Sequence, residues 1–346
     1  MQAFPPVSDI RHLVSRFPKS LKQGILAYEV DRLVSRFIDP RDTLVISGFW
    51  RSGTTWLQQS LAKVLKAKSV YEPLSPLVHD IKEVYFHDHL STNNKDVSFL
   101  RFYMPFCSGT TLDGHPLREL FYKALRAEVS GGRTRFSRTR LTEAFRLKVV
   151  VKFIRAHLCL RAAQETFFVP AIHIYRDPRS VVASMKRLGW KWFFNHLVLR
   201  DQLLEPRDGR AQFFGQWHDE ILEYDKKGEI ARAAAYWALT EKFLQHCYSD
   251  HQARISFLRY EELCQKRETL LLETLRKLTV AYDVNGNARF LDIDSDTTSE
   301  QRRKASVGER VEGWKETLSG SEISTIESIA RRFGFEDRLY QEEDQT

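Results

Sequence analysis

The sequence predicts an α/β fold of three layers, in which helices cover both faces of a central, mostly parallel sheet. Two segments share one order of elements, a short apolar run followed by a turn and a helical pattern, at 43–65 and 171–187. Further apolar runs, at 147–154 and 255–260, alternate with stretches of helical spacing. Strands that alternate with helices are typical of a parallel sheet covered on both sides. A ligand is then expected beyond the carboxyl ends of the strands.

Length and composition favour one globular domain. The chain has 346 residues, of which 42% are hydrophobic and 28% charged, and these values are ordinary for a protein with a sizeable core. The two segments must meet in one site, so we expect a single domain over 1–346. Its long irregular inserts are expected to face the substrate, because long loops in compact domains are often functional. We predict a helical lead-in at 1–40 and a core at 43–335. The core contains two such inserts, at about 75–140 and 189–216, and an acidic tail follows at 336–346.

The net charge of +8 limits the classes of partner. A basic chain suits nucleic acid, an anionic membrane surface or acidic small molecules. The sequence contains neither a zinc-finger spacing nor an aromatic RNA-binding signature, so we expect no nucleic acid partner. A nucleotide with several anionic groups accounts for the excess charge.

Cysteine usage and hydropathy indicate the compartment. The four cysteines are far apart and form no C-x-x-C pair, which favours reduced thiols over a disulfide framework. The first residues contain no apolar leader core, and no stretch of the sequence approaches the roughly 18 apolar residues of a membrane span. We therefore expect no transmembrane segment and a cytoplasmic protein, although a lumenal domain separated from its anchor would show the same features.

The segment TLVISGFWRSGTTWL at 43–57 says most about function. An apolar strand, a glycine-containing loop and a helix start follow one another there, and the free N–H groups of such a helix start bind anions. Gly48 and Gly53 match the triphosphate-binding pattern G-x-x-x-x-G-K-S/T. Thr54 takes the place of its lysine, and Arg51 supplies a cation three residues earlier. The loop therefore favours a smaller anion than a triphosphate and argues against a P-loop kinase.

A second anion site is predicted in the segment AIHIYRDPRSVVASMKR. Its first five residues, 171–175, form a candidate buried strand, and the Asp-Pro that follows is typical of a helix start. Arg176 leaves the strand, and Ser184 lies eight residues later, about two helical turns along. One fixed cation and one hydroxyl could together hold an anion.

Together the two segments resemble the sulfotransferase family, whose members use 3′-phosphoadenosine-5′-phosphosulfate (PAPS). The family's loop, K/R-S-G-T-T-W, is matched by RSGTTW at 51–56. Its second motif is an Arg, then a Pro, then a Ser eight residues after the Arg, and it is matched at Arg176, Pro178 and Ser184. Looser similarity is carried by LRYEEL and RRKASVGERVEGWKETL, at 258–263 and 302–318. The resemblance covers about residues 43–333 and implies a P-loop nucleotide-binding core.

The resemblance also implies a role for each motif residue. The 5′-phosphosulfate would be held by Arg51, Ser52, Gly53, Thr54 and Thr55. Adenine would stack on Trp56, and the 3′-phosphate would be held by Arg176 and Ser184, helped by Arg302, Arg303 and Lys304. Arg51 would also act in catalysis, by stabilising the negative charge that develops during transfer. The product would be adenosine 3′,5′-bisphosphate.

Two residues compete as the base that takes the proton of the acceptor. Glu72, in VYEP, is similar in position to the Glu of family members that act on glycans or tyrosines. His157, in KFIRAHL, is similar to the His of the small-molecule branch, with Arg155 in place of a Lys. Histidine suits the role by its near-neutral pKa, whereas Glu72 needs burial to raise its pKa. We favour Glu72 and leave His157 open.

The function implied by the resemblance is transfer of a sulfuryl group from PAPS to a hydroxyl, with a glycan or glycolipid as the preferred acceptor. A small molecule or a peptide tyrosine is the alternative acceptor. A non-catalytic protein that binds a nucleotide or polyanion is the alternative of another class. We expect no metal, because the three histidines and two aspartates between 79 and 89 lack a recurrent zinc spacing.

Overall fold

A parallel sheet forms the centre of the structure. The computed structural model describes residues 19–75, 102–129, 141–206, 208–249, 254–281 and 307–339. In this part of the chain, five strands form one sheet in the order β2-β3-β1-β4-β5, and all neighbours are parallel. The strands are β1 (Thr43–Ser47), β2 (Lys68–Tyr71), β3 (Val149–Phe153), β4 (Ala171–Tyr175) and β5 (Ile255–Arg259). The predicted parallel α/β fold is confirmed.

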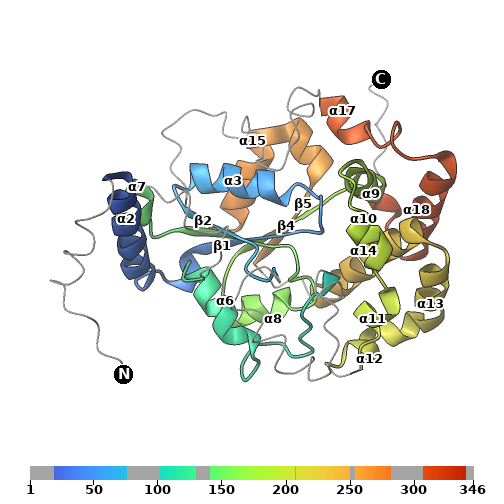
Figure 1. Ribbon diagram of the computed structural model, residues 1–346, viewed down its shortest axis with the longest axis horizontal. Helices are drawn as coiled ribbons and strands as arrows, with labels where there is room; N and C mark the ends of the chain where they lie inside the picture. Colours follow the sequence, from blue (N-terminus) through green and yellow to red (C-terminus); the bar gives the residue numbers. More distant parts are fainter. Residues whose placement is uncertain are drawn as a thin grey trace.

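Helices cover both faces of this sheet (Figure 1). They are α3 (Thr54–Val64), α6 (Leu117–Leu125), α8 (Leu160–Phe167) and α15 (Tyr260–Lys277). In Figure 1, α3 and α15 lie above the sheet, and α6 and α8 lie below it. The side chains of β1 alternate between the two sides: Leu44 and Ile46 join the core with α3 and α15, and Val45 joins the core with α6 and α8. A strand buried on both faces is a continuous apolar run in the sequence, which is why β1 was predictable.

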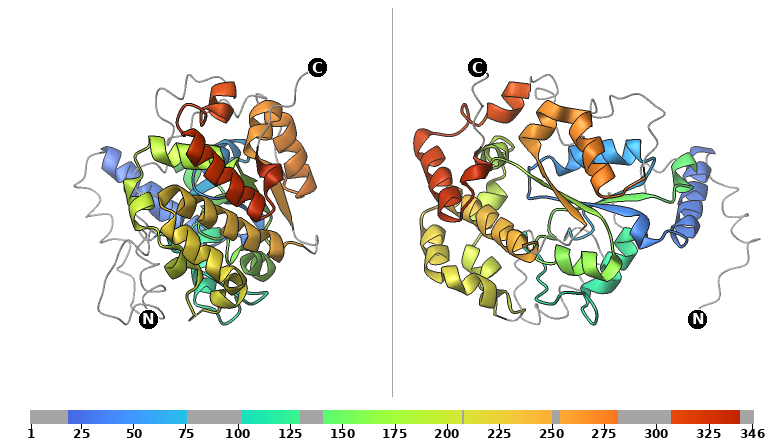
Figure 2. Two further views of the ribbon diagram at one scale, coloured as in Figure 1. Left: turned by 90° about the vertical axis from the view of Figure 1, so that its right-hand side faces the viewer. Right: turned by 180° about the vertical axis from the view of Figure 1, so that it is seen from behind.

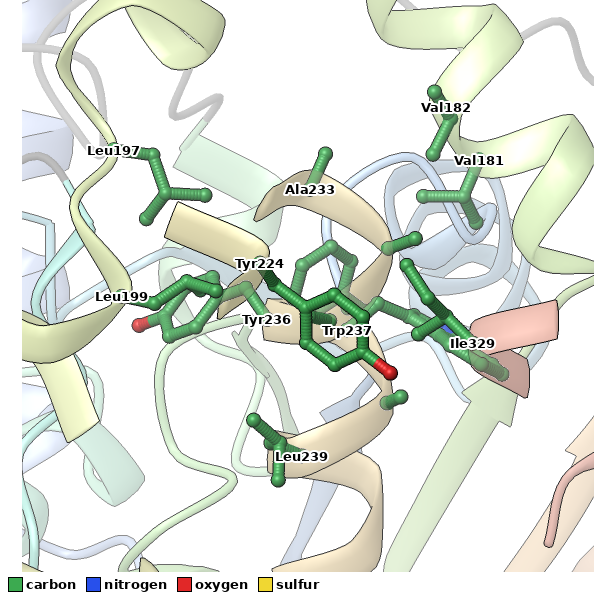
Figure 3. Packing of buried hydrophobic residues seen from close by; sticks show 14 of the residues in the cluster. Val181, Val182, Leu197, Leu199, Tyr224, Ala233, Tyr236, Trp237, Leu239 and Ile329 are labelled. Carbon is green, nitrogen blue, oxygen red and sulfur yellow. The ribbon is translucent and has the colours of Figure 1, made fainter. Parts of the chain in front are cut away.

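A third cluster of buried side chains lies among the helices at one end of the molecule. This end faces the viewer in the left view of Figure 2. These helices are α9 (Pro178–Arg187), α10 (Lys191–His196), α11 (Leu199–Leu203), α12 (Arg210–Phe214), α13 (His218–Lys226), α14 (Glu229–Cys247) and α18 (Gly320–Arg332). Figure 3 shows Tyr236 and Trp237 of α14 among Val181 of α9, Leu199 of α11 and Ile329 of α18. Helix α14 thereby supports α9, which carries the second predicted anion motif.

The insert at 189–216 was predicted to be irregular, and this was wrong. It contains the short helices α10, α11 and α12, and it contributes Phe193, Leu199 and Phe214 to the third cluster, each fully buried. Apolar residues within it recur at spacings of three and four, as in Trp190, Phe193 and Leu197, and that spacing is typical of helices with one buried face. The polar residues Lys191, Asn195 and His196, which lie between them, obscured this pattern.

The remaining elements flank the sheet and the helical end. They are α2 (Lys19–Ser35), η1 (Pro40–Asp42), α7 (Leu141–Ala144), η2 (Gly215–Trp217), α17 (Val307–Glu312) and η3 (Glu336–Arg338). Helix α2 falls within the predicted helical lead-in, and α6 falls within the insert at 75–140. The rest of that insert, at 76–101 and 130–140, and the end of the acidic tail, at 340–346, lie outside the described residues. Among the helices that are described, none is both long and apolar enough to cross a membrane.

Candidate active site

Both predicted anion motifs lie at the carboxyl edge of the sheet. Strands β1 and β4 are parallel neighbours and end at Ser47 and Tyr175. The chain after β1 forms the loop 48–53 and enters α3 at Thr54, and the chain after β4 enters α9 at Pro178. Because parallel neighbours end at the same edge, the loop and the second motif lie side by side. Ligands of open parallel sheets bind at this edge.

The two glycines of the loop occupy positions that no side chain can share. A Cβ atom on Gly48 would lie 2.4 Å from the carbonyl oxygen of Ile174. A Cβ atom on Gly53 would lie 2.6 Å from the ring of Tyr260, and Gly53 has a φ of +92°, which favours glycine. Arg51 also has a left-handed φ, +68°, and such backbone strain at a non-glycine residue clusters at functional sites. The loop is therefore held in one closely packed conformation.

The loop offers hydrogen-bond donors that suit an anion. Helix α3 begins at Thr54, so its first N–H groups and the positive end of its dipole lie at the loop. Ser52 is fully buried, yet its hydroxyl has no hydrogen-bond partner in the described part of the chain. Buried hydroxyls without a partner are rare, and an oxygen of a bound anion would supply one. The residues present therefore fit a phosphate or sulfonate group.

The loop and the second motif are in direct contact. Arg51 Nε donates a hydrogen bond of 3.1 Å to Ser184 Oγ, and Arg176 Nη1 donates one of 3.2 Å to the carbonyl oxygen of Arg51. The guanidinium of Arg176 also lies over the ring of Tyr260, at 4.2 Å from its centre. Asp177 caps α9, because its side chain accepts a hydrogen bond from the N–H of Arg179. Residues that are far apart in the sequence thus meet beside the loop.

The structure describes only some of the residues that are predicted to contact adenine and the 3′-phosphate. The half-buried ring of Trp56 packs edge-on against Tyr260, with 5.9 Å between ring centres. Arg302, Arg303 and Lys304 lie outside the described residues. The segment that follows them does reach the site, since the carbonyl oxygen of Arg310 accepts a 2.7 Å hydrogen bond from Arg176 Nη2.

Glu72, the favoured candidate base, belongs to an ion cluster beside the loop. It follows β2 in a left-handed conformation, with a φ of +46°. Its Oε1 lies 2.9 Å from Lys152 Nζ, and its Oε2 lies 3.1 Å from Arg155 Nη1. Lys152 Nζ also donates a 2.9 Å hydrogen bond to Thr55 Oγ1, in the first turn of α3. One ammonium group therefore connects the carboxylate of Glu72 to the loop.

Electrostatics keep Glu72 ionised in this arrangement. Burial raises the pKa of the Glu72 carboxyl, but the nearby Lys152 and Arg155 cations outweigh it, so that its pKa is lowered from the ordinary value of 4.5. Burial also lowers the pKa of Lys152, against the opposing effect of Glu72. Glu72 was expected to need burial to raise its pKa. The burial is present, but the two cations reverse its effect.

Sequence reasoning missed Lys152, although the predicted strand at 147–154 contains it. The signal was a single charged residue within the apolar run VVVKF. Lysine is almost never fully buried unless it is paired, and Lys152 is only 1% exposed. A lone lysine in a central strand therefore predicts a buried acceptor near it, and two are present here, Glu72 and Thr55.

His157, the other candidate base, belongs to a separate cluster. Its side chain is fully buried, and its Nε2 lies 3.4 Å from Glu241 Oε1. Its ring packs edge-on against the rings of Phe49 and His173. Glu241 was not singled out in the sequence, because it lies within the long helical pattern of α14. The two candidate bases are thus held in different surroundings, one in an ion cluster and one in the core.

The solved structures that match the chain include three sulfotransferases of low sequence identity. The sulfotransferase domain of the curacin biosynthetic pathway aligns with 18% identity and a TM-score of 0.42, covering 85% of this chain and 97% of that chain. The sulfotransferase domain of the Synechococcus PCC 7002 olefin synthase aligns with 15% identity and a TM-score of 0.38, covering 85% and 96%. The sulfotransferase STF1 of Mycobacterium tuberculosis H37Rv aligns with 13% identity and a TM-score of 0.38, covering 85% and 84%.

The family of the chain is shown by its sequence. No curated protein matches the chain significantly. The model of the sulfotransferase domain, however, matches residues 41–270, well over half of the chain and including both anion motifs. The protein belongs to the sulfotransferase domain family.

Proposed function

We propose that this protein transfers the sulfuryl group of PAPS to a hydroxyl group of an acceptor. The hydrogen bond from Arg51 to Ser184 carries the proposal, because it joins the predicted phosphosulfate loop to the predicted 3′-phosphate motif. A donor with an anionic group at each end suits two adjacent anion sites. A nucleoside triphosphate has its charges in one chain and would leave the second site without a role.

Each motif residue is proposed to hold one part of the donor. When bound, PAPS supplies the sulfuryl group and a phosphate that leaves with the nucleotide. The guanidinium of Arg51 and the N–H groups of 51–55 would hold the phosphosulfate, and Trp56 would stack on adenine. Ser184 Oγ accepts its hydrogen bond from Arg51, so its own hydroxyl hydrogen stays available for the 3′-phosphate, beside Arg176.

We propose Glu72 as the base that accepts the proton of the acceptor hydroxyl. Its support is the link through Lys152 to Thr55, which holds a carboxylate next to the loop. An anion on the loop would compete for Lys152 and Arg155 and would repel the carboxylate, and both effects raise the pKa of Glu72. His157 has less support, because its Nε2 faces Glu241 in the core.

The acceptor is proposed to be a hydroxyl of a glycan or glycolipid. This choice rests on the position of Glu72 after β2, which is similar to that of the catalytic Glu in family members that act on glycans. A small phenol or a peptide tyrosine is the second candidate, because the same position is also used in tyrosine sulfation. We also propose a reducing compartment, such as the cytoplasm, since all four cysteines are free thiols: Cys107, Cys159, Cys247 and Cys264.

A panel of acceptors tests the proposal directly. Oligosaccharides, glycolipids, phenols and tyrosine peptides are incubated with PAPS and the protein, and mass spectrometry detects an added sulfonate. We expect a sulfated glycan or glycolipid with the wild type and none with Arg51→Ala. Sulfated phenols alone would move the acceptor to the second class, and tight binding of adenosine 3′,5′-bisphosphate without transfer to any acceptor would favour a non-catalytic protein.

The second motif is tested by nucleotide affinity. Arg176→Ala should weaken the binding of adenosine 3′,5′-bisphosphate by about 10- to 100-fold, because a hydrogen bond to a charged group contributes about 1.5–3 kcal/mol. The exposed Arg200 on α11 provides the control, and Arg200→Ala should bind like the wild type. Unchanged affinity in Arg176→Ala would show that the 3′-phosphate is held elsewhere.

A further inference from the structure

Three metal-ligating side chains meet in the core beneath the anion loop. His157 follows β3, His173 lies in β4 and Glu241 lies in α14, and each is at most 1% exposed. His173 Nε2 lies 3.1 and 3.2 Å from the two carboxylate oxygens of Glu241, and His157 Nε2 lies 3.4 Å from Glu241 Oε1. One ligand atom of each residue lies within 4.8 Å of the others. The proposed transfer reaction uses neither His173 nor Glu241.

The buried Glu241 carboxylate needs a compensating positive charge, either a proton on one of the imidazoles or a bound cation. In the described part of the chain, the Glu241 carboxylate is paired only with the two imidazoles. A buried carboxylate without a compensating charge costs several kcal/mol. His157 Nδ1 is fully buried and has no hydrogen-bond partner within the described residues, which is unfavourable, and His157 Nε2 has only the 3.4 Å contact with Glu241 Oε1. A bound cation would satisfy the carboxylate and Nε2 of His157 together.

The surroundings of His173 are compatible with a metal ligand. Its Nδ1 lies 3.3 Å from Ser47 Oγ, at the end of β1. If Nδ1 carries the ring proton and donates it to that hydroxyl, then Nε2 presents a lone pair toward Glu241 and His157. Histidines that bind metals almost always donate the other ring N–H to such a partner, which fixes the tautomer and the ring orientation.

The donor set and spacing fit a tetrahedral divalent ion. Two imidazole nitrogens and one carboxylate oxygen are a recurrent ligand set for Zn²⁺. Bonds of about 2.0–2.1 Å at tetrahedral angles place neighbouring ligand atoms about 3.3 Å apart, and the separations from the Glu241 carboxylate here are 3.1–3.4 Å. We propose that His157, His173 and Glu241 form a buried Zn²⁺ site. The ion would link the chain after β3, strand β4 and helix α14, and His173 Nδ1 would connect it to Ser47 at the end of β1, just before the loop that starts at Gly48.

This proposal revises the expectation that the protein has no metal. The spacing rules for zinc motifs could not have found the site, because its ligands come from three separate elements that meet only in the folded sheet. The histidines between 79 and 89, which were considered in the sequence, lie outside the described residues.

Metal content of the full chain is the direct test. The protein is produced without a histidine tag and dialysed against metal-free buffer. Its zinc content is then measured by elemental mass spectrometry. We expect about one Zn²⁺ per chain. Removal with dipicolinate should lower the melting temperature, and Zn²⁺, but not Mg²⁺, should restore it. The proposal would be overturned if the protein held less than about 0.1 Zn²⁺ per chain and Zn²⁺ did not change its melting temperature. The positive charge that compensates Glu241 would then be a proton on one of the two imidazoles.

Substitutions locate the metal. Glu241→Gln and His157→Gln keep the side-chain volume and should each reduce the zinc content to less than about a tenth of the wild-type value. The exposed His218 of α13 provides the matched control, and His218→Gln should keep its zinc. Zinc retained in Glu241→Gln would place the metal elsewhere and refute this site. If Glu241→Gln does not fold, the zinc content and the dipicolinate response of the wild type still decide.

Discussion

Lys152 and Glu72 form an ion pair of 2.9 Å at the carboxyl edge of the sheet. The same ammonium group donates to Thr55 in the first turn of α3. The pair therefore connects β3, the end of β2 and the anion loop. The Lys152 side chain is almost completely buried, and the Glu72 side chain is only 13% exposed. The pair is therefore shielded from solvent, and its charges interact strongly.

Replacement of Lys152 separates its role in the site from its role in stability. Lys152→Met should abolish transfer and should lower the free energy of unfolding by up to about 3 kcal/mol, because breaking a buried pair leaves a charge partly unpaired. Arg155 remains beside Glu72 and limits this loss. Urea unfolding and a transfer assay measure the two effects.

A second buried ion pair of β2 provides the control. Lys68 lies 2.7 Å from Asp31, at the end of the strand remote from Glu72, and both side chains are at most 7% exposed. Lys68→Met should lose a similar amount of stability while its transfer activity and nucleotide affinity stay at the wild-type level. Normal transfer by a folded Lys152→Met variant would show that Lys152 is only structural.

The choice between the two candidate bases can be settled by matched amide variants. Glu72→Gln should lower kcat by about 100- to 10,000-fold, the usual contribution of a general base, while adenosine 3′,5′-bisphosphate still binds. His157→Gln should lower stability and zinc content, and kcat per folded molecule should fall far less. Steady-state kinetics and calorimetric binding give both readings. The reverse pattern would assign the base to His157.

The lowered pKa of Glu72 makes a prediction about acid stability. A carboxyl whose pKa falls on folding stabilises the protein above its unfolded pKa, here 4.5, and this stabilisation is lost as the pH drops through the lower folded value. The difference in unfolding free energy between the wild type and Glu72→Gln should therefore be constant above about pH 5 and should shrink in more acidic solution. Urea unfolding across this range measures it.

The exposed Glu273 on α15 is the control for this titration. Glu273→Gln leaves the Lys152 pair intact, so this variant should keep the loss of stability below about pH 5 that protonation of Glu72 causes in the wild type. A difference between the wild type and Glu72→Gln that grows as the pH falls would contradict the ion pair as described.

The sequence predicted β1, β3, β4 and β5 and missed β2, the short polar strand at one edge of the sheet. Strand β4 has the predicted bounds, Ala171–Tyr175, because a buried parallel strand is a continuous apolar run. Strand β2 reads KSVY and pairs on one side only within the described sheet. Its polar residues gave no such run, so the strand that positions Glu72 was not predicted.

The candidate site was predictable where one motif supplies several residues, and not where contacts join distant segments. The loop and the Arg176 motif could be recognised because each is contiguous in the sequence. Lys152 and Glu241 lie alone in a strand and in a helix, and their partners follow from the order of strands in the sheet. A single sequence does not reveal that order, so neither the ion cluster nor the histidine cluster could be inferred from it.

The close packing of Gly53 in the loop can be tested by comparison with Gly114, which has the same left-handed backbone conformation but no close neighbours. Gly53 and Gly114 both have a left-handed φ, +92° and +74°, but a Cβ atom would meet the ring of Tyr260 only at Gly53, and nothing lies within 4 Å at Gly114. Alanine costs about 1–2 kcal/mol at either position through the backbone alone. Gly53→Ala should add to this a displacement of Tyr260 and of the Arg176 guanidinium that lies over it. Both variants should therefore unfold at lower urea concentration, whereas only Gly53→Ala should bind adenosine 3′,5′-bisphosphate more weakly. Equal nucleotide affinity in the two variants would mean that the packing of the loop against Tyr260 does not shape the nucleotide site.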